Sequence, residues 1–237
     1  MNYIIQKIFL LVVLSLNLLA CNTTKTAPTI TSQTKNTYLS ADLYNEFKKQ
    51  IPDFPSEGSP AQAADEAQLR MLQKSRTKTD CERANTEVEV TLQSLYGKPY
   101  GPLTAQQVTA LQPLIKHIRE ESGPYIGQIK NSFNRPRPYD YLSDLKPCLP
   151  KEQSLAYPSG HATLAALYGI VLSDLLPKNK IELEKRAEQI GLDRILGGVH
   201  HPSDVLFGKK LGLLIYAELK KSITYNDDIE AYKKSLN

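Results

Sequence analysis

The chain has 237 residues, 41% of them hydrophobic, and its 29 Lys and Arg residues against 25 Asp and Glu residues give a formal net charge of +4. This composition is near the globular average, so it excludes wholesale disorder, a collagen-like chain and a disulfide-dense miniprotein. The small positive charge is spread along the chain and the three Cys residues fit no zinc-finger spacing, so we expect no nucleic-acid partner.

The N-terminal segment has the pattern of an export signal. Lys7 precedes an apolar stretch over residues 8–16, which is too short to cross a bilayer comfortably. Residues 18–21 read Leu-Leu-Ala-Cys and resemble the bacterial lipobox, in which the Cys is acylated and becomes the first mature residue. The alternative is an ordinary secretory signal with a Cys nearby. We expect a lipoprotein signal peptide over residues 1–20 and a lipid anchor on Cys21.

A polar, Thr-rich stretch follows the anchor. Residues 21–37 lack hydrophobic periodicity, so we expect a flexible tether that ends where a folded domain over residues 38–223 begins. The residue after Cys21 is Asn22 rather than Asp, which by analogy with enteric lipoproteins leaves the protein free to reach the outer membrane. We therefore expect an exported protein on the periplasmic side of the cell envelope, attached to the membrane only by lipid.

Helix signals recur in the first part of the domain, whereas strand signals do not. The pair Ser59-Pro60 combines an N-cap with Pro at the first helical position and predicts a helix that runs to about Lys74. The capping-box pattern Thr79-x-x-Glu82 predicts another helix, in which apolar residues recur at helical spacing until Gly97.

A second capping-box pattern, Thr104-x-x-Gln107, begins the next predicted helix. Its apolar face continues to Ser122-Gly123-Pro124, where we expect it to end, and a separate short helix should cover residues 125–133. The residues before Pro136 and Pro138 favour extended backbone, so residues 134–138 should form an exposed loop.

Three further segments complete the predicted fold. Ser159 caps a strongly apolar helix over residues 160–176, and another helix covers residues 182–196. Ser203 caps a final long helix over residues 204–221, and residues 224–237 remain as a C-terminal tail. The expected buried residues of the final helix are Val205, Leu206, Leu213, Leu214 and Tyr216. The predicted architecture is an all-α bundle of six to eight helices.

Two junctions between loops and helices combine charge with helix ends. The first contains Lys130 and Arg137, and its simplest interpretation is a solvated basic turn. The second runs from Tyr157 to His161 and contains the pair Ser159-Gly160 at a helix start. Free backbone N–H groups and the positive end of the helix dipole make such a start an anion site, although Pro-Ser-Gly alone is also an ordinary turn with an N-cap.

The third junction contains a candidate nucleophile. His200 precedes Asp204 by four residues, so the carboxylate can accept the Nδ1–H of the imidazole and leave Nε2 as the nucleophile. His201 is adjacent, but only His200 has Arg194 six residues before it and Asp204 four residues after it. We therefore prefer His200, and we expect His117, which lies in an ordinary helical pattern, to be structural or exposed.

Taken in order, the junctions read Lys-x6-Arg-Pro, Pro-Ser-Gly-His and Arg-x5-His-x3-Asp. This series resembles the tripartite motif of the type 2 phosphatidic acid phosphatase superfamily, and most closely the soluble class A bacterial non-specific acid phosphatases. The stretch over residues 57–65 is similar to an upstream segment of the same enzymes. The resemblance implies an all-helical acid phosphatase, with its site at loop-helix junctions, that acts on small-molecule phosphate monoesters through a phosphohistidine.

The resemblance also implies a role for each motif residue. His200 attacks phosphorus, Asp204 holds its ring, and His161 protonates the leaving group and later activates water. The residues implied to surround the phosphoryl oxygens are Lys130, Arg137, Ser159, Gly160 and Arg194. The Lys-x6-Arg spacing selects Arg137, so Arg135 is expected to be a surface or supporting cation. Because three cations take the place of Mg²⁺ and the sequence has no two-metal carboxylate cluster, we expect no metal and no cofactor.

One position departs from the family pattern. The family usually has Ser immediately before the second Arg of the motif, and this chain has Asp193. A carboxylate near the phosphate would repel it, so Asp193 must point away or pair with a cation such as Lys130 or Arg194. The same cations favour loss of the proton from His161, so we expect an acidic pH optimum.

Cys81 and Cys148 remain once Cys21 is acylated. A disulfide between them and two separate buried thiols are both compatible with the sequence. The alternative functions are a lipid or head-group phosphatase, a vanadium-dependent haloperoxidase and an inactive anion-binding lipoprotein. A homo-oligomer is also compatible with the sequence.

Overall fold

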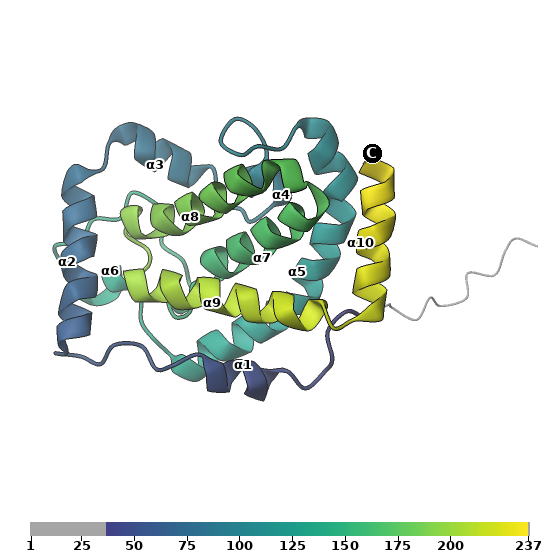
Figure 1. Ribbon diagram of the computed structural model, residues 1–237. Helices are drawn as coiled ribbons and strands as arrows, with labels where there is room; N and C mark the ends of the chain where they lie inside the picture. The colour runs from purple at the N-terminus through teal and green to yellow at the C-terminus, as the bar shows by residue number, and fades with distance from the viewer. Residues whose placement is uncertain (1–36, 237) are drawn as a thin grey trace, which may run out of the picture. The chain divides into compact units, whose positions relative to one another are not determined.

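The computed structural model describes residues 37–236, so the expected signal peptide and nearly all of the expected tether lie outside the described residues. This part of the chain contains ten α-helices, one 3₁₀ helix and no strand, which confirms the all-α class (Figure 1). Eight of the α-helices have at least seven residues, and two are single turns. The α-helices are α1 (Tyr44–Gln50), α2 (Pro60–Ser75), α3 (Lys78–Asn85), α4 (Leu92–Tyr96), α5 (Ala105–Phe133), α6 (Pro138–Tyr141), α7 (Gly160–Leu175), α8 (Lys180–Leu196), α9 (Pro202–Leu219) and α10 (Ile223–Leu236).

Helix α7 forms the centre of the domain. Twelve of its 16 residues are buried, because it packs against α8 and α9 and also contacts α5. Figure 1 shows α7 lying between α8 and α9. A helix that is apolar on every side is typical of a fully buried element. The predicted bounds of this helix differ from the observed ones by one residue at the C-terminal end.

Helices α7 and α9 approach each other closely through two glycines of α9. A Cβ atom on Gly208 would lie 2.5 Å from the carbonyl oxygen of Ser159, and one on Gly212 would lie slightly closer still to that of Thr163. The Ser159 N–H also donates to the backbone carbonyl of Asp204 at 2.8 Å. The starts of the two helices, which carry the second and third parts of the motif, are therefore in direct backbone contact.

Helix α5 is longer than the sequence predicts. The expected capping box of Thr104 and Gln107 is present, but the helix does not end at Pro124 and continues to Phe133. A proline inside a helix removes one hydrogen bond and costs about 3 kcal/mol. Here the buried positions Ile118, Ser122, Tyr125 and Ile129 keep one three-to-four-residue spacing across the proline, so burial of a single face favours the continuous helix.

The single helix predicted from Thr79 to Gly97 is two helices. Helix α3 has a capping box formed by Thr77 and Asp80, two residues earlier than predicted, and Thr91 and Ser94 form another at the start of α4. The segment between them leaves the helical path after Thr86. Glu87 in this segment is fully buried, so the chain breaks its helix where an acidic side chain enters the interior.

The start of α9 also differs from the prediction. His201, not Ser203, is the N-cap residue, because its backbone N–H donates to the Asp204 carboxylate at 2.8 Å. Two residues expected to be buried, Leu206 and Leu213, are 59% and 50% exposed. The glycine contacts with α7 fix which face of α9 turns inward, and that face carries Leu211 and Ile215.

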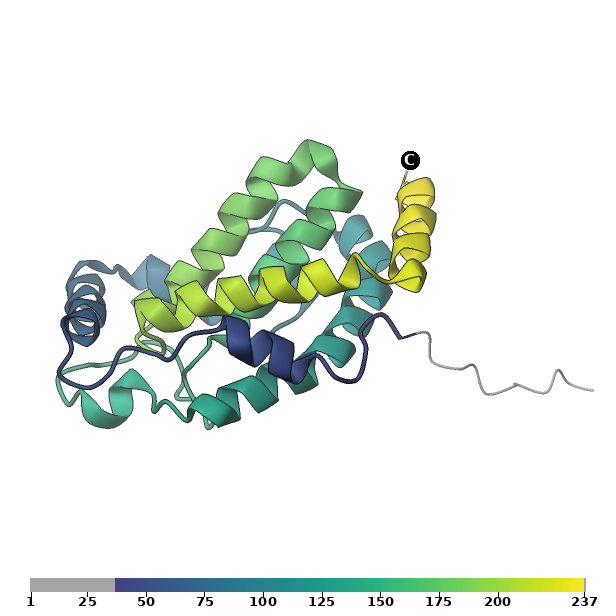
Figure 2. The same ribbon diagram turned by 60° about the horizontal axis from the view of Figure 1, so that its bottom comes forward.

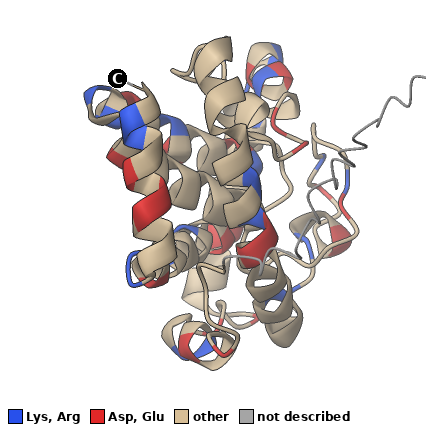
Figure 3. Ribbon diagram, turned by 90° about the vertical axis from the view of Figure 1, so that its right-hand side faces the viewer, with Lys and Arg blue, Asp and Glu red and all other residues tan. Residues whose placement is uncertain are grey.

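The two ends of the described chain meet at α5 and α10. Tyr38 stacks on His117 of α5 at 4.2 Å between ring centroids, and its hydroxyl donates to Asp228 of α10 at 2.5 Å. His117 is thus structural. Residues expected as a C-terminal tail form α10, in which acidic residues precede basic ones (Figure 3), and Tyr225 and Ile229 of this helix are buried.

In Figure 2, α1 lies against α5 and α9. None of the helices in residues 37–236 has the length and apolar character that a membrane span requires.

Candidate active site

The predicted motif residues converge where α7 and α9 begin, at the end of α8 and in the loop after α5. Every one of them except Gly160, which is half-buried, has at most 9% of its surface exposed. Hydrogen bonds connect the three parts of the motif: Arg137 donates to His200, Lys130 to the carbonyl of Pro158, and Ser159 to Asp204. The structure therefore brings together residues that the sequence spreads over three junctions.

His200 is held in the form that a nucleophile requires. Its Nδ1 lies 3.2 Å from the Asp204 carboxylate, and its Nε2 accepts a hydrogen bond from Arg137 Nη1 at 3.0 Å. Because a guanidinium can only donate, Nε2 carries the lone pair and Nδ1 carries the proton. Burial, and then the charge of Arg137, lower the pKa of His200 well below its usual value, so the ring is neutral.

His201 is not distinguished from His200 by its carboxylate partner. Asp204 Oδ2 also accepts from His201 Nδ1 at 3.0 Å, so the carboxylate orients both rings. The difference lies at the other ring nitrogen: His201 Nε2 is 2.6 Å from the hydroxyl of Tyr141, whose ring stacks on the imidazole. Both rings therefore have both nitrogens engaged, but Nε2 of His201 faces a tyrosine hydroxyl, whereas Nε2 of His200 faces the motif cation Arg137.

Asp204 is a fully buried carboxylate with several donors. In addition to the two histidine rings, it accepts from Arg135 Nη1 at 2.6 Å. Burial alone would raise its pKa, but the hydrogen bonds from His200 and His201 lower the pKa well below its usual value. Asp204 is thus an anion able to stabilise a positive charge that develops on His200.

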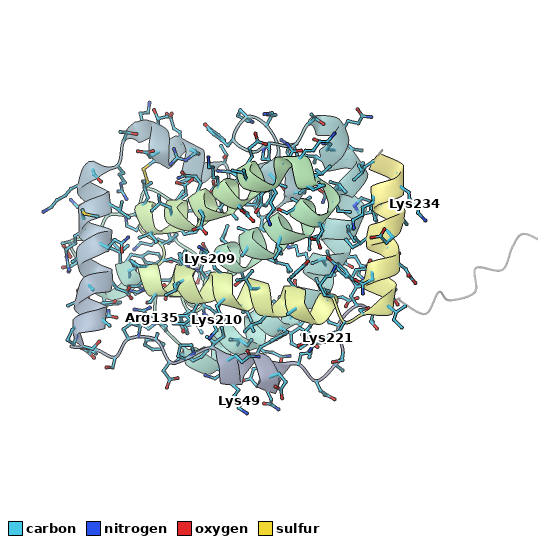
Figure 4. The ribbon with its side chains drawn as sticks, in the orientation of Figure 1. Lys49, Arg135, Lys209, Lys210, Lys221 and Lys234 are labelled. Carbon is cyan, nitrogen blue, oxygen red and sulfur yellow. A yellow bond between two sulfur atoms is a disulfide. The ribbon has the colours of Figure 1, made fainter. Side chains whose placement is uncertain are left out.

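Arg135 lies in a loop that was expected to be exposed, which is wrong for this residue, and of its two expected roles, surface or supporting cation, the structure has the supporting one. The exposed fractions of Arg135 and Arg137 are both 2%. Arg135 lies near the start of α9 (Figure 4) and bridges two carboxylates. Its Nη1 donates to Asp204, and its Nη2 donates to Asp65 of α2 at 3.1 Å. Gln62 of α2 accepts from the same guanidinium at 2.8 Å. Helix α2 therefore supports the nucleophile through Arg135, a role that the motif spacing does not indicate.

Arg137 uses all its donors within the protein. Its Nε donates to the carbonyl of Ser154, and Nη1 donates to the carbonyl of Val199 as well as to His200. Its Nη2 donates to the Glu152 carboxylate at 2.6 Å and to the Ser154 hydroxyl at 2.9 Å. A phosphoryl oxygen that binds Arg137 must therefore replace one of these acceptors.

Lys130 holds the turn that precedes α7. Its ammonium group donates to the carbonyls of Leu155 at 2.6 Å and Pro158 at 3.0 Å, with that of Ala156 at 3.4 Å. Burial, and then Arg137, lower its pKa to about 7. Lys130 is thus both a positive charge beside the site and an anchor for the Pro-Ser-Gly-His segment.

His161 lies in the first turn of α7. Its Nε2 donates to the backbone carbonyl of Glu87 at 3.1 Å, so Nδ1 is the nitrogen that gains or loses a proton. Burial, and then Arg194, lower the pKa of His161 to about 4, while Glu152 opposes the shift. The ring is therefore poised to release a proton in the acidic range.

Arg194 is oriented by a residue that the sequence did not single out. Its Nη2 donates to Glu87 at 2.9 Å and to the carbonyl of Ala84 at 2.6 Å. Its buried Nε has no hydrogen-bond partner among the described residues and can donate to a phosphoryl oxygen. Burial raises the pKa of Glu87 to about 8, although Arg194 opposes this rise. A single Glu after a helix carries no sequence signal for this role.

Asp193 pairs with a cation, as expected, but with a different one. Arg83 of α3 forms two hydrogen bonds with the buried carboxylate, at 2.7 and 2.9 Å, and Gln189 donates a third at 2.9 Å. The expected partners, Lys130 and Arg194, instead bind backbone carbonyls and Glu87. The charge of Asp193 is therefore matched by a guanidinium.

Two cysteines connect α3 to the segment before the second part of the motif. Cys81 and Cys148 form a disulfide with a Cα–Cα distance of 5.9 Å. Of the two arrangements left open by the sequence, the structure has the bonded one. Helix α3, which supplies contacts to Asp193 and Arg194, is thus covalently joined to the loop that leads to Glu152.

The start of α7 offers fewer N–H groups than expected. The Ser159 N–H donates to Asp204, so it is not free for phosphate, and the Ser159 hydroxyl caps the helix at 3.4 Å from the Ala162 nitrogen. The N–H groups of Gly160 and His161 lie in the first turn, which has no intrahelical acceptors. Within residues 37–236, no three His, Cys, Asp or Glu side chains are grouped to hold a metal ion.

Comparisons with known proteins agree with this geometry. The profile of a family described as the PAP2 superfamily matches residues 108–228, just over half of the chain. The chain is 29% identical over 192 residues to an acid phosphatase of Zymomonas mobilis, covering 77% of this chain and 72% of that protein. It is 28% identical over 130 residues to a non-specific acid phosphatase of Salmonella typhimurium, and this match spans about half of each protein, 52%. A lipid A 1-phosphatase of Rhizobium johnstonii is 28% identical over 95 residues, covering 38% of this chain and 39% of that protein.

Proposed function

Because the chain belongs to the PAP2 superfamily, we propose that it is a metal-independent phosphatase that hydrolyses phosphate monoesters through a phosphohistidine on His200. The observation that carries this proposal is the environment of His200, whose Nδ1–H faces Asp204 and whose Nε2 lone pair faces Arg137. The relatives named acid phosphatase support the same reaction class.

In the first step, Nε2 of His200 forms a bond to phosphorus while the bond from phosphorus to the leaving oxygen breaks. His161 supplies a proton to that oxygen, so the alcohol leaves as a neutral molecule. The imidazolium formed on His200 is stabilised by Asp204, which already accepts the Nδ1–H. The negative charge on the phosphoryl oxygens is stabilised by Arg137 and Arg194, and by the first turn of α7.

In the second step, water attacks phosphorus and the bond from phosphorus to Nε2 breaks. His161, now neutral, accepts the proton that the water loses, and inorganic phosphate leaves with His200 restored. The cations keep their role because the same oxygens carry the charge in both steps. Fixed guanidinium and ammonium groups supply this stabilisation, so the proposed reaction needs no metal ion.

The proposed pH optimum is acidic. His200 stays neutral in the acidic range because its pKa is well below the usual value, so the nucleophile is available there. His161 has a pKa lowered to about 4, so its protonated form is lost as the pH rises. Both shifts favour turnover at low pH.

The lipid anchor and its consequences are part of the proposal. We propose that Cys21 carries the lipid and places the domain on the periplasmic side of the envelope, at the outer membrane. Small soluble phosphate monoesters are the proposed substrates. A second candidate is a lipid or head-group phosphatase, which the similarity to the Rhizobium lipid A 1-phosphatase and the expected anchor favour. An inactive lipoprotein was motivated only by Asp193, whose pairing with Arg83 removes that reason.

The proposal is tested by assaying the full chain, purified in detergent, on p-nitrophenyl phosphate in EDTA. We expect turnover that vanadate inhibits, and a loss of at least about 10³-fold in kcat for His200→Ala. The matched control is His201→Ala, which removes the adjacent ring and should cost about tenfold or less, because that ring only orients Asp204. Activity that survives His200→Ala, or that EDTA abolishes, would contradict the mechanism. A vesicle-bound phospholipid phosphate that is hydrolysed faster than the soluble ester would favour the second candidate.

A further inference from the structure

Glu152 places a carboxylate against the cation that should bind the substrate. Its Oε2 lies 2.6 Å from Arg137 Nη2, and Nη1 of the same guanidinium faces Nε2 of His200. We propose that Glu152 competes with the substrate phosphate for Arg137 and thereby sets the phosphate affinity of the site. This inference rests on the proposed function, because it concerns the same phosphate site.

The hydrogen bonds of Arg137 identify Glu152 as the acceptor that phosphate displaces. A guanidinium has five N–H donors, and all five have acceptors here. Two of these acceptors, the carbonyls of Ser154 and Val199, belong to the backbone. Glu152 is the one charged acceptor among the five, and its side chain is 30% exposed, so it can turn towards solvent. The exposed carboxylate of Asp140 also contacts Arg137, but it accepts from the backbone N–H at 3.1 Å and not from the guanidinium.

The backbone around Glu152 is held, so only its side chain needs to move. The Tyr139 hydroxyl accepts from the Glu152 N–H at 2.9 Å and donates to its carbonyl at 3.0 Å. The N–H of Ala156 donates to the carbonyl of Arg135 at 2.9 Å, and Cys148 is bonded to α3. Rotation of one side chain therefore exposes Arg137 without rebuilding the loop.

The charge of Glu152 makes the competition effective. Burial would raise its pKa, but the charge of Arg137 holds the pKa below its usual value, so the group is an anion in the proposed acidic working range. A phosphate that binds the same guanidinium brings further negative charge, and like charges at one site oppose each other. The phosphate binds Arg137 only after it displaces Glu152 from this ion pair.

The test compares the full chain with its Glu152→Gln variant, which keeps the shape of the side chain and removes its charge. Titration calorimetry with inorganic phosphate measures affinity, and p-nitrophenyl phosphate measures KM and kcat. We expect Glu152→Gln to lower the phosphate Kd and the KM about three- to tenfold at low salt. The difference should shrink as salt is added.

Two further variants separate charge from other effects. Glu152→Asp keeps the charge and should bind phosphate within about twofold of the unmodified chain. Glu218→Gln is the matched control, since Glu218 pairs with Lys221 and is 21% exposed, about 21 Å along α9 from Asp204. It should leave Kd and KM unchanged.

The outcomes of the two proposals are distinguishable. An unchanged or higher phosphate Kd in Glu152→Gln would overturn the inference, because it would mean that Glu152 has no effect on phosphate binding or strengthens it. The same holds if neither protein binds phosphate. Phosphate binding without turnover of p-nitrophenyl phosphate by the unmodified chain would instead count against the proposed function. Measured Tm values show whether each variant remains folded.

Discussion

Replacing Gly208 with Ala tests whether the close contact of α7 and α9 holds the catalytic residues in register. Gly208 faces the start of α7, and a Cβ there would lie 2.5 Å from the Ser159 carbonyl oxygen and 3.1 Å from the Ala162 Cβ. Neither neighbour can move alone, because one is backbone and the other is a buried residue of the central helix. The two helices must separate to accept the methyl group.

The distances around Gly208 give the expected size of the loss in stability and activity. Ordinary contacts begin near 3.4 Å, so the helices must part by about 1 Å. Overpacking of this kind costs about 1–3 kcal/mol, and the better helix propensity of Ala returns up to about 1 kcal/mol. A net loss of about 1–2 kcal/mol lowers the Tm of a domain of this size by about 3–6 °C. A displacement of about 1 Å between catalytic groups can also lower kcat by about 100-fold.

Thermal unfolding and steady-state kinetics measure the two effects separately. The matched control is Gly127→Ala in α5, where a Cβ meets no atom within 4 Å and the substitution should leave kcat unchanged and the Tm equal or higher. A Gly208→Ala protein with the Tm and kcat of the unmodified chain would refute the idea that backbone contact between α7 and α9 positions the site.

Two further predictions concern charge. Arg83→Ala should lower the free energy of unfolding by about 3 kcal/mol, because it leaves the buried Asp193 without its cation. Chemical denaturation measures this change. A loss below about 0.5 kcal/mol would mean that other donors satisfy Asp193. The kcat of the unmodified chain should fall as the pH rises, because the lowered pKa of His161 means that its protonated form is lost already in the acidic range. A pH profile of kcat with its maximum above about 8 would contradict the assignment of His161 as the acid.

The parts of the fold that local chemistry determines were predictable. The caps at Ser59, Thr104 and Ser159 lie where their hydrogen-bonding side chains indicate, and the helices that follow them are present. The motif residues were assigned to three loop-helix junctions, and hydrogen bonds bring these junctions together in the structure. What local patterns could not predict was the continuation of α5 through Pro124, since the burial of one shared face decides it.

The supporting residues of the site were not predictable, because their partners are distant in the chain. Arg83 lies 110 residues before Asp193, and Asp65 lies 70 residues before Arg135. A lone acidic residue such as Glu87 or Glu152 has no pattern that separates it from a surface carboxylate. The burial of Arg135 was not predictable for the same reason, because it depends on two carboxylates, one of them in α2, that only the folded chain brings near it.

The disulfide between Cys81 and Cys148 has a topological consequence. It closes a covalent ring over 67 residues of sequence separation, and this ring contains Lys130 and Arg137 together with the Glu87 segment. A protease that cut one exposed bond inside the ring would therefore produce two pieces that remain joined. One half of the phosphate site would stay tethered to the other after cleavage, and the nicked protein would run as a single species until a reductant was added.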